Sequence, residues 1–290
     1  MRKLLSAVKR RLEPKQNGDL AVYRELQKKL VSVSRYEAGT VTAGNWHLQY
    51  LDATSLLSSF DVVVVKRWND FISRKRDPLI LDCGANIGIS AIHYKRLFPE
   101  ARVTSFEPDP RACELLRCNL AANNIHDVNV VEAALWKTNG RNSFFSEGAD
   151  ANRLMEKLEE INKLTTLTPS ATHCKVETVR LADYLTAEDE VDFVKLDIES
   201  AETEVIADCA DSLRRVRSMV IEFHMTNSQP RDLARTLSTL ADAEFHVSVT
   251  SYGPWVDLLH QTTGPANDKI EFDQYLLICA WRPEGNFVVS

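Results

Sequence analysis

Features that would indicate a membrane, secreted or nucleic-acid-binding protein are missing from this 290-residue chain. No apolar run approaches the roughly 18 residues that a membrane-spanning helix needs. The basic first residues, MRKLLSAVKRRL, lack the apolar core of a signal peptide. Basic residues are not in excess, since 35 Lys and Arg face 41 Asp and Glu for a net charge of -6. A nucleic-acid partner requires a basic surface, so we expect no such partner, no transmembrane segment and no secretion.

Cysteine pairs are also missing. The six cysteines are scattered, with no C-x-x-C pair and no Cys/His cluster at the spacing of a zinc site. Reduced thiols in a cytoplasmic protein fit this pattern. Nothing in the sequence sets an oligomeric state.

From about residue 78 the chain alternates between short apolar runs and helical periods, which is typical of a layered α/β domain with a mostly parallel sheet. We predict seven strands, at residues 78–84, 102–108, 128–135, 191–198, 218–225, 245–251 and 274–281. The predicted helices between them lie at 88–97, 110–124, 201–215 and 229–242, on both faces of the sheet. The main domain is therefore predicted over residues 76–290.

Two segments stand outside this alternation. Residues 1–75 are predicted to be an extension with a helical start and mixed strand and helix signals. Its first residues carry a short apolar stripe beside basic residues, formed by Leu4, Leu5, Val8 and Leu12. We favour packing of this stripe on the domain, and weak contact with a membrane surface is the alternative.

The second segment is an insertion at about 138–175, where Leu154, Leu158 and Ile161 recur at helical spacing. It is either a lid or a decoration.

A glycine turn follows the first strand of the alternating region, in LDCGANIGIS at residues 81–90. A strand that passes through such a turn into a helix exposes backbone N–H groups, and Gly84 and Gly88 would let a ligand approach them. The dinucleotide fingerprint G-x-G-x-x-G needs glycine where this chain has Asn86, so that class fits poorly. Taken alone, the motif is explained equally well by a tight turn without a ligand.

The next two strand ends favour a nucleoside. Glu107 lies 23 residues after Gly84, where an acid at a strand end accepts hydrogen bonds from ribose hydroxyls. Ala133 and Ala134 end the third strand, where small residues leave a flat slot for an adenine ring or simply pack.

Polar side chains follow the fourth and fifth strands. The two-residue period puts Asp197 and Glu199 on one side with Lys195, and Glu222 and His224 on one side of the next strand. Carboxyl ends of strands in an open α/β sheet are where ligands bind. Each residue alone has a structural explanation, such as pairing of Lys195 with Asp197, but as a set they predict a functional site.

Five ordered blocks resemble the FkbM family of S-adenosylmethionine-dependent methyltransferases. They are LILDCGANIGISAIHYKRLFP, VTSFEPDP, NVVEAALWKTNG, VDFVKLDIESAETEVI and VIEFHM, within residues 78–250. The resemblance implies a class I methyltransferase fold, which is Rossmann-like with a seven-stranded sheet, and methyl transfer to a hydroxyl of a sugar, glycan or natural product. Ser200 departs from the family pattern K-x-D-x-E-G-A-E, which leaves the backbone path there open, although serine is a reasonable helix N-cap.

The resemblance also implies which residues bind the cofactor. The glycine turn would surround its methionine part, with Asp82 as an anion for its ammonium group, and Glu107 would hold the ribose. The expected cofactor-binding residues are Asp82, Gly84, Ala85, Asn86, Gly88, Glu107, Asp109, Ala133, Ala134 and Asp197. The extension at 1–75 would pack on or shape the acceptor site.

Two accounts of catalysis stay open, because an alcohol is a poor nucleophile until it loses its proton. In the first, which we favour, His224 or Asp197 is a general base, with Glu222 and Glu199 as further candidate catalytic residues. In the second, Asp197, Glu222 and His224 hold Mg²⁺, which lowers the pKa of a bound hydroxyl. A nicotinamide-dependent oxidoreductase and a non-catalytic module that keeps the fold are the alternative functions.

Overall fold

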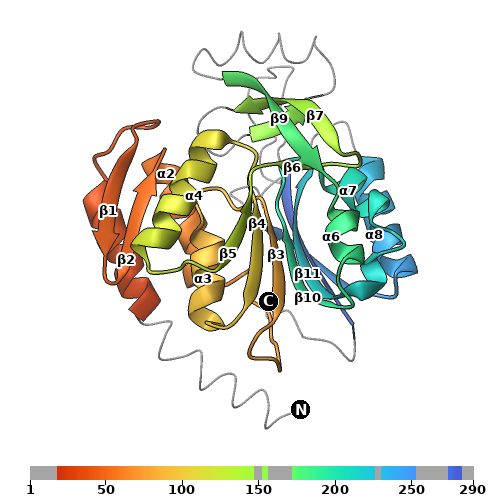
Figure 1. The fold of residues 1–290 in the computed structure, drawn as a ribbon. Coiled ribbons are helices and arrows are strands. Elements are labelled where there is room, and N and C mark those ends of the chain that lie inside the picture. The colour runs from red at the N-terminus through yellow and green to blue at the C-terminus, as the bar shows by residue number, and fades with distance from the viewer. Residues whose placement is uncertain (1–17, 147–151, 156–171, 226–229, 253–273, 283–290) are drawn as a thin grey trace, which may run out of the picture.

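The computed structural model describes residues 18–146, 152–155, 172–225, 230–252 and 274–282. A seven-stranded sheet lies at its centre (Figure 1). In spatial order its strands are β12 (His246–Tyr252), β13 (Gln274–Trp281), β11 (Val216–Met225), β10 (Val191–Leu196), β3 (Leu79–Cys83), β4 (Arg102–Phe106) and β5 (Val128–Val131). Only β13 runs antiparallel to its neighbours in this sheet. The predicted mostly parallel sheet is therefore confirmed.

Helices cover both faces of the sheet, with α3 and α4 on one side and α6 to α8 on the other (Figure 1). Their bounds are α3 (Ile89–Leu97), α4 (Pro110–Ala122), α6 (Leu181–Thr186), α7 (Glu202–Asp208) and α8 (Pro230–Asp242). Helix α4 begins where the sequence indicates, because Pro110 fixes the first turn and the Asp109 carboxylate accepts a hydrogen bond from the backbone N–H of Arg111 at 2.9 Å.

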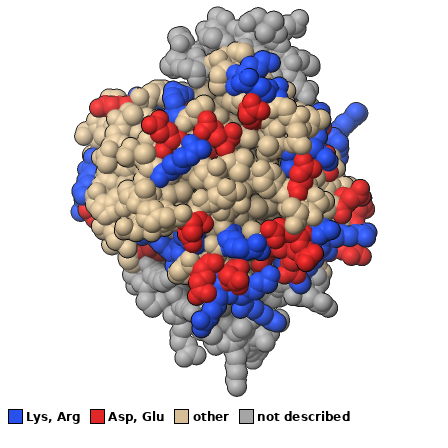
Figure 2. Space-filling model, in the orientation of Figure 1, with Lys and Arg blue, Asp and Glu red and all other residues tan. Residues whose placement is uncertain are grey.

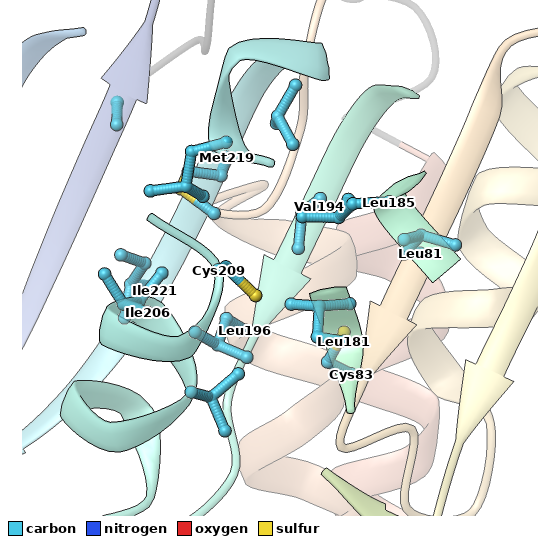
Figure 3. Packing of buried hydrophobic residues seen from close by; sticks show 14 of the residues in the cluster. Leu81, Cys83, Leu181, Leu185, Val194, Leu196, Ile206, Cys209, Met219 and Ile221 are labelled. Carbon is cyan, nitrogen blue, oxygen red and sulfur yellow. The ribbon is translucent and has the colours of Figure 1, made fainter. Parts of the chain in front are cut away.

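The two-residue period of the strands separates two cores. On one face, leucine, valine and methionine side chains pack against α6 and α7, as Figure 3 shows for Leu81, Leu181, Leu185, Val194, Ile206, Cys209, Met219 and Ile221. On the other face Ile80, Phe193, Val220 and Leu277 pack with Tyr94 of α3. The polar residues Asp82, Lys195, Glu222 and Tyr275 each lie two positions from a member of this second core, so they continue its face toward the carboxyl ends of the strands.

Two predicted elements are shorter than expected. The predicted strand at 128–135 ends at Val131, because the Val131 carbonyl accepts from the N–H of Ala133 in a tight turn. Strand β6 (Ala134–Leu135) then joins another sheet. The predicted helix at 201–215 ends at Asp208 and is followed by the 3₁₀ helix η2 (Leu213–Arg215). Ser212 accounts for this break, since its hydroxyl donates to the Cys209 carbonyl at 2.9 Å.

A second sheet, in the order β6-β9-β7-β8, lies beyond the carboxyl ends of the central strands (Figure 1). It comprises β6, β7 (Gly140–Ser146), β8 (Asn152–Met155) and β9 (Thr172–Val179). Leu154 belongs to β8 and pairs with Phe144, so the helical interpretation of its spacing is wrong there because strand pairing overrides a short periodic pattern. Leu158 and Ile161 lie outside the described residues.

The N-terminal part forms a layer beside α3 and α4. It contains a helix over residues 18–30, the hairpin of β1 (Gly39–Ala43) and β2 (Trp46–Tyr50), helix α2 (Ala53–Phe60) and the π-helical turn η1 (Asp61–Val65). Its apolar side chains share one core with Leu116 of α4 and Ile89 of α3. The apolar stripe at residues 4–12 lies outside the described residues. Among the helices that the structure describes, none combines the length and apolarity needed to cross a membrane. On the face drawn in Figure 2, Lys and Arg side chains lie among Asp and Glu side chains.

Candidate active site

A cavity of about 640 Å³ lies at the carboxyl ends of β3, β4, β10 and β11. This volume is within the range of sites for small molecules and cofactors. Most of the predicted site residues line it, namely Gly84, Ala85, Asn86, Glu107, Ala133, Ala134, Asp197, Glu199, Glu222 and His224. The structure thus brings together residues from five separate sequence blocks.

Three predicted residues do not line the cavity. Asp82 is fully buried behind the wall, where its carboxylate accepts from the Ser90 hydroxyl at 2.7 Å and lies 4.0 Å from Lys195 Nζ. Gly88 packs on α4, since a Cβ there would lie 2.5 Å from a methyl group of Leu116. Asp109 caps α4. The structure thus gives these three residues contacts within the protein, and their contact with a cofactor stays a prediction.

The glycine turn is held by the protein's own backbone. The N–H groups of Gly84 and Ala85 donate to the Phe106 carbonyl at 3.0 and 2.9 Å, and that of Gly88 donates to the Ala85 carbonyl at 2.9 Å. Gly84 has a φ of 80°, and a Cβ there would lie 1.7 Å from the Asp197 carbonyl oxygen. Gly84 therefore makes room for the end of β10, while it also lines the cavity.

Glu107 fixes the middle of the same turn. Its carboxylate accepts from the N–H of Asn86 and from the N–H of Asp109, each at 2.8 Å. Burial raises the pKa of Glu107 to about 7, and the two hydrogen bonds oppose that rise. Each carboxylate oxygen has a further lone pair, so Glu107 still has acceptor capacity toward the cavity that it lines.

Lys195 joins the glycine turn to the end of β10. Its Nζ donates to the Gly84 carbonyl at 2.7 Å and lies 3.1 Å from Asp197 Oδ2, so the pair considered from the sequence is present. Burial alone would lower the pKa of Lys195, but the Asp197 and Asp82 carboxylates raise it above its ordinary value. The lysine is thus a buried side chain between two acidic residues, with Nζ 3.1 Å from Asp197 and 4.0 Å from Asp82. Sequence reasoning missed its link to the turn.

His224 lies between two carboxylates. Its Nδ1 is 3.1 Å from Glu202 Oε1 and its Nε2 is 3.4 Å from Glu199 Oε2. Burial alone would lower the pKa of His224, but Glu202 and Glu199 together raise it well above the ordinary value. Each of the two imidazole nitrogens therefore faces a carboxyl group. Glu202 was not predicted as a site residue, although it is the last acid of the K-x-D-x-E-x-A-E pattern that pointed to this region.

The turn between β10 and α7 adopts a left-handed backbone. Glu199 and Ser200 have φ values of 55° and 75°, and Glu202 accepts from the N–H groups of Ile198 and Ser200 at 3.3 and 3.2 Å. Ala201 is the N-cap of α7, so the expectation that Ser200 caps this helix is wrong. Ser200 occupies a conformation that favours glycine, and the hydrogen bonds to Glu202 hold it there.

The predicted magnesium ligands come together only in part. Asp197, Glu199 and His224 place ligand atoms within 4.8 Å of one another, and Glu222 is not in that group of described residues. Both imidazole nitrogens already face carboxylates. Asp197 is paired with Lys195. A metal ion bound by these side chains would have to break these contacts.

The N-terminal layer supplies one wall of the cavity, which the sequence did not reveal in detail. The lining residues of this wall, all from α2, η1 and the segment after it, are Ser58, Ser59, Asp61, Val62, Val63, Lys66, Trp68 and Asn69. Lys66 Nζ lies 2.7 Å from the Asp61 carboxylate and 4.7 Å from the centre of the Trp68 ring. π-Helical turns such as η1 are frequent at functional sites. Phe144 of β7 lines the cavity as well.

The sheet order, the single antiparallel strand and the strand-end cavity define a class I, Rossmann-like methyltransferase fold. The chain belongs to the FkbM methyltransferase family, because residues 82–247, more than half of its length, match the Methyltransferase FkbM domain.

Relatives include methyltransferases of bacteria and fungi. The chain is 29% identical over 163 residues to the 2-O-methyltransferase NoeI of Sinorhizobium fredii, a match that covers 51% of this chain and 64% of NoeI. It is 28% identical over 180 residues to the methyltransferase sdnD of Sordaria araneosa, which covers 53% and 69% of the two chains. A solved methyltransferase FkbM from Methylobacillus flagellatus aligns with a TM-score of 0.42 at 13% identity, over 90% of this chain and 58% of that one. The matched part thus spans just under two thirds of NoeI.

Proposed function

We propose that this protein transfers a methyl group from S-adenosylmethionine to a hydroxyl group of a sugar, glycan or natural product. Membership of the FkbM methyltransferase family supports methyl transfer, and similarity to a 2-O-methyltransferase supports oxygen as the acceptor atom. The single observation that carries the proposal is the shared cavity, which joins the strand-end acid Glu107 to the Asp197 and His224 cluster. Methyltransferase family membership also disfavours the oxidoreductase alternative.

Several lining residues suit the methyl donor. Glu107 accepts hydrogen bonds from the ribose hydroxyls, Asn86 and Ala85 lie against the methionine part, and Ala133 and Ala134 leave space for the adenine ring. When bound, S-adenosylmethionine supplies an electrophilic methyl group on a positively charged sulfur. Carboxylates outnumber cations on the described cavity wall, which favours a cationic ligand.

Of the two candidate bases, Asp197 is the better placed to remove the acceptor proton. Asp197 lines the cavity with a side chain 26% exposed, and its carboxylate lies 3.1 Å from Lys195 Nζ. His224 is less exposed, at 9%, and both its nitrogens contact carboxylates. We therefore assign the general base to Asp197, and to His224 the role of holding Glu199 and the end of β11 in place.

Titration calorimetry with S-adenosylmethionine, S-adenosylhomocysteine and NAD tests the donor. Micromolar binding of the first two and none of NAD is expected, and the reverse pattern would refute the proposal. For the base, Asp197→Asn should lower kcat, measured at saturating S-adenosylmethionine, by on the order of 100-fold or more. Asp183→Asn is the matched control, since Asp183 is an exposed partner of Arg180 remote from the cavity wall. Activity should also survive EDTA, and a loss restored by Mg²⁺ would contradict the assignment.

A further inference from the structure

The glycine turn between β3 and α3 has a backbone that depends largely on partners elsewhere in the chain. Gly84, Asn86 and Gly88 have left-handed φ values of 80°, 47° and 94°, a run that neither a helix nor a strand contains. Glu107 accepts from the Asn86 N–H at 2.8 Å, and Lys195 donates to the Gly84 carbonyl at 2.7 Å. The shape of this wall of the cavity is therefore set by the groups that bond to the turn.

One of these groups lies in α4. The carbonyl oxygen of Ile87, in the middle of the turn, accepts a hydrogen bond from Asn119 Nδ2 at 2.8 Å. Ile87 lines the cavity, whereas Asn119 does not line it and is fully buried, with 0% of its surface exposed. Asn119 would therefore act on a ligand in the cavity only through the turn.

The rest of the Asn119 amide binds β2 of the N-terminal hairpin. Nδ2 also donates to the Gln49 carbonyl at 2.9 Å, and Oδ1 accepts from the Gln49 N–H at 2.7 Å. A side-chain amide has two donor hydrogens, and here one is used on the turn and one on the strand. The orientation of the amide follows from its partners, because a backbone N–H only donates and a backbone carbonyl only accepts. Asn119 thus joins the glycine turn to the edge of β2.

Asn123, four residues later at the C-cap of α4, makes the matching contacts with β2. Its Nδ2 donates to the His47 carbonyl at 2.8 Å, and its Oδ1 accepts from the His47 N–H at 3.4 Å. The remaining hydrogen bonds of its side chain, among the described residues, go to the Asn119 carbonyl and to Arg96. Both asparagines hold the hairpin on α4, but only Asn119 also holds the turn.

The Ile87 carbonyl belongs to the peptide group that joins Ile87 to Gly88. The N–H of this peptide group donates to the Ala85 carbonyl at 2.9 Å, and the Asn119 bond holds its other side. A buried carbonyl that loses its donor pays a desolvation penalty, and glycine lets the adjacent backbone rotate to avoid it. Without the Asn119 amide the turn would therefore lose its fixed shape. The proposed function places the methionine part of S-adenosylmethionine there, against Ala85 and Asn86.

We propose that Asn119 is a positioning residue of the donor site. It fixes the glycine turn against the hairpin of β1 and β2, so that this hairpin contributes to the binding of S-adenosylmethionine although none of its residues lines the cavity. The inference rests on the proposed function, because it presupposes that the cavity holds the methyl donor. It extends the donor site to residues 39–50, which precede the family domain that begins at residue 82.

Titration calorimetry of the full chain with S-adenosylmethionine, well below the Tm of each variant, tests this role. Asn119→Leu and the smaller Asn119→Ala both remove the donor to Ile87, and each should raise the Kd on the order of tenfold, about the net value of one hydrogen bond. Asn123→Leu and Asn123→Ala remove the matching contacts with β2 and should leave the Kd unchanged. Thermal unfolding should show a lowered Tm in all four variants, since each loosens the hairpin, so the Kd separates positioning from a purely structural role.

The outcomes separate the inference from the proposed function. A Kd in the Asn119 variants equal to that of the wild type would overturn the inference, and so would an equal rise in the Asn119 and Asn123 variants. In both cases binding of the methyl donor by the wild type would stand. A wild-type protein that binds no S-adenosylmethionine would refute the proposed function, and the inference with it.

Discussion

Replacing Gly84 with alanine tests whether the glycine turn makes room for the protein's own backbone. At a φ of 80° an alanine pays about 1–2 kcal/mol for the left-handed conformation. Its Cβ would also lie 1.7 Å from the Asp197 carbonyl oxygen, and the backbone shift needed to relieve that overlap costs about 1–3 kcal/mol. The sum is about 2–5 kcal/mol, which at about 2 °C per kcal/mol for a chain of this size predicts a fall in Tm of roughly 4–10 °C.

The assay combines thermal unfolding with S-adenosylmethionine titration well below the lowered Tm. Gly140→Ala is the control that measures backbone strain without steric overlap. Gly140 has a positive φ of 149°, but nothing lies within 4 Å of the position where a Cβ would be. Gly88→Ala should cost less than Gly84→Ala, because its nearest neighbour is the flexible end of Leu116 at 2.5 Å. A Gly84→Ala protein as stable as the wild type that no longer bound the cofactor would refute the reasoning, because the glycine would then serve a ligand.

Three further outcomes follow from the site. Ser200→Gly should raise the free energy of unfolding by roughly 0.5–1 kcal/mol. The substitution relieves the strain of a serine in the left-handed region, and this gain exceeds the cost of glycine's greater freedom in the unfolded chain. A denaturant titration that shows destabilisation would contradict this. Lys195→Met should lower the free energy of unfolding by about 3–5 kcal/mol, because it leaves Asp82 buried without its cation. Adding Asp82→Asn to this variant should restore part of that loss, which a double-mutant cycle would measure. Cofactor affinity, measured by calorimetry, should rise about tenfold from pH 6 to pH 8. Over this range Glu107, with its pKa near 7, loses its proton and becomes the carboxylate to which the ribose hydroxyls donate. The Glu107→Gln variant should show no such rise.

The raised pKa of Glu107 has the opposite effect on stability, which should fall as the pH rises. Because the pKa of Glu107 is raised in the folded protein, the folded state binds more protons than the unfolded one between the ordinary glutamate pKa and about 7. Its contribution to stability therefore falls as the pH rises through that window. Glu107→Gln should flatten this part of the curve of unfolding free energy against pH.

Local patterns in the sequence were sufficient for the central sheet. Strand period and helix period are properties of neighbouring residues, so the seven strands were predicted within a few residues of their ends. The breaks after Val131 and after Asp208 were missed because they depend on partners. Strand β6 leaves the central sheet to pair with β9, more than forty residues later in the chain, and the end of α7 depends on the Ser212 hydroxyl.

The part of the site that lies at the carboxyl ends of the parallel strands could be predicted from the sequence. Glu107, Asp197 and His224 reach one cavity because carboxyl ends of parallel strands meet at one edge. The inward position of Asp82 was not foreseen, since a motif gives an order of residues but not the layer in which each lies. Glu202 and Asn69 were missed because their contacts cross between elements, from α7 to β11 and from the N-terminal layer to the cavity.

The wall formed by residues 58–69 precedes the region that matches the family domain, which begins at residue 82. Under the proposed function, groups that recognise the methyl donor and groups on the wall nearest its recipient are encoded in separate stretches of the gene. Mutations can accumulate in one stretch while the other stays constant, so a lineage can change what it modifies without rebuilding how it holds the donor. Grafting residues 53–71 between relatives is the corresponding route for engineering altered selectivity.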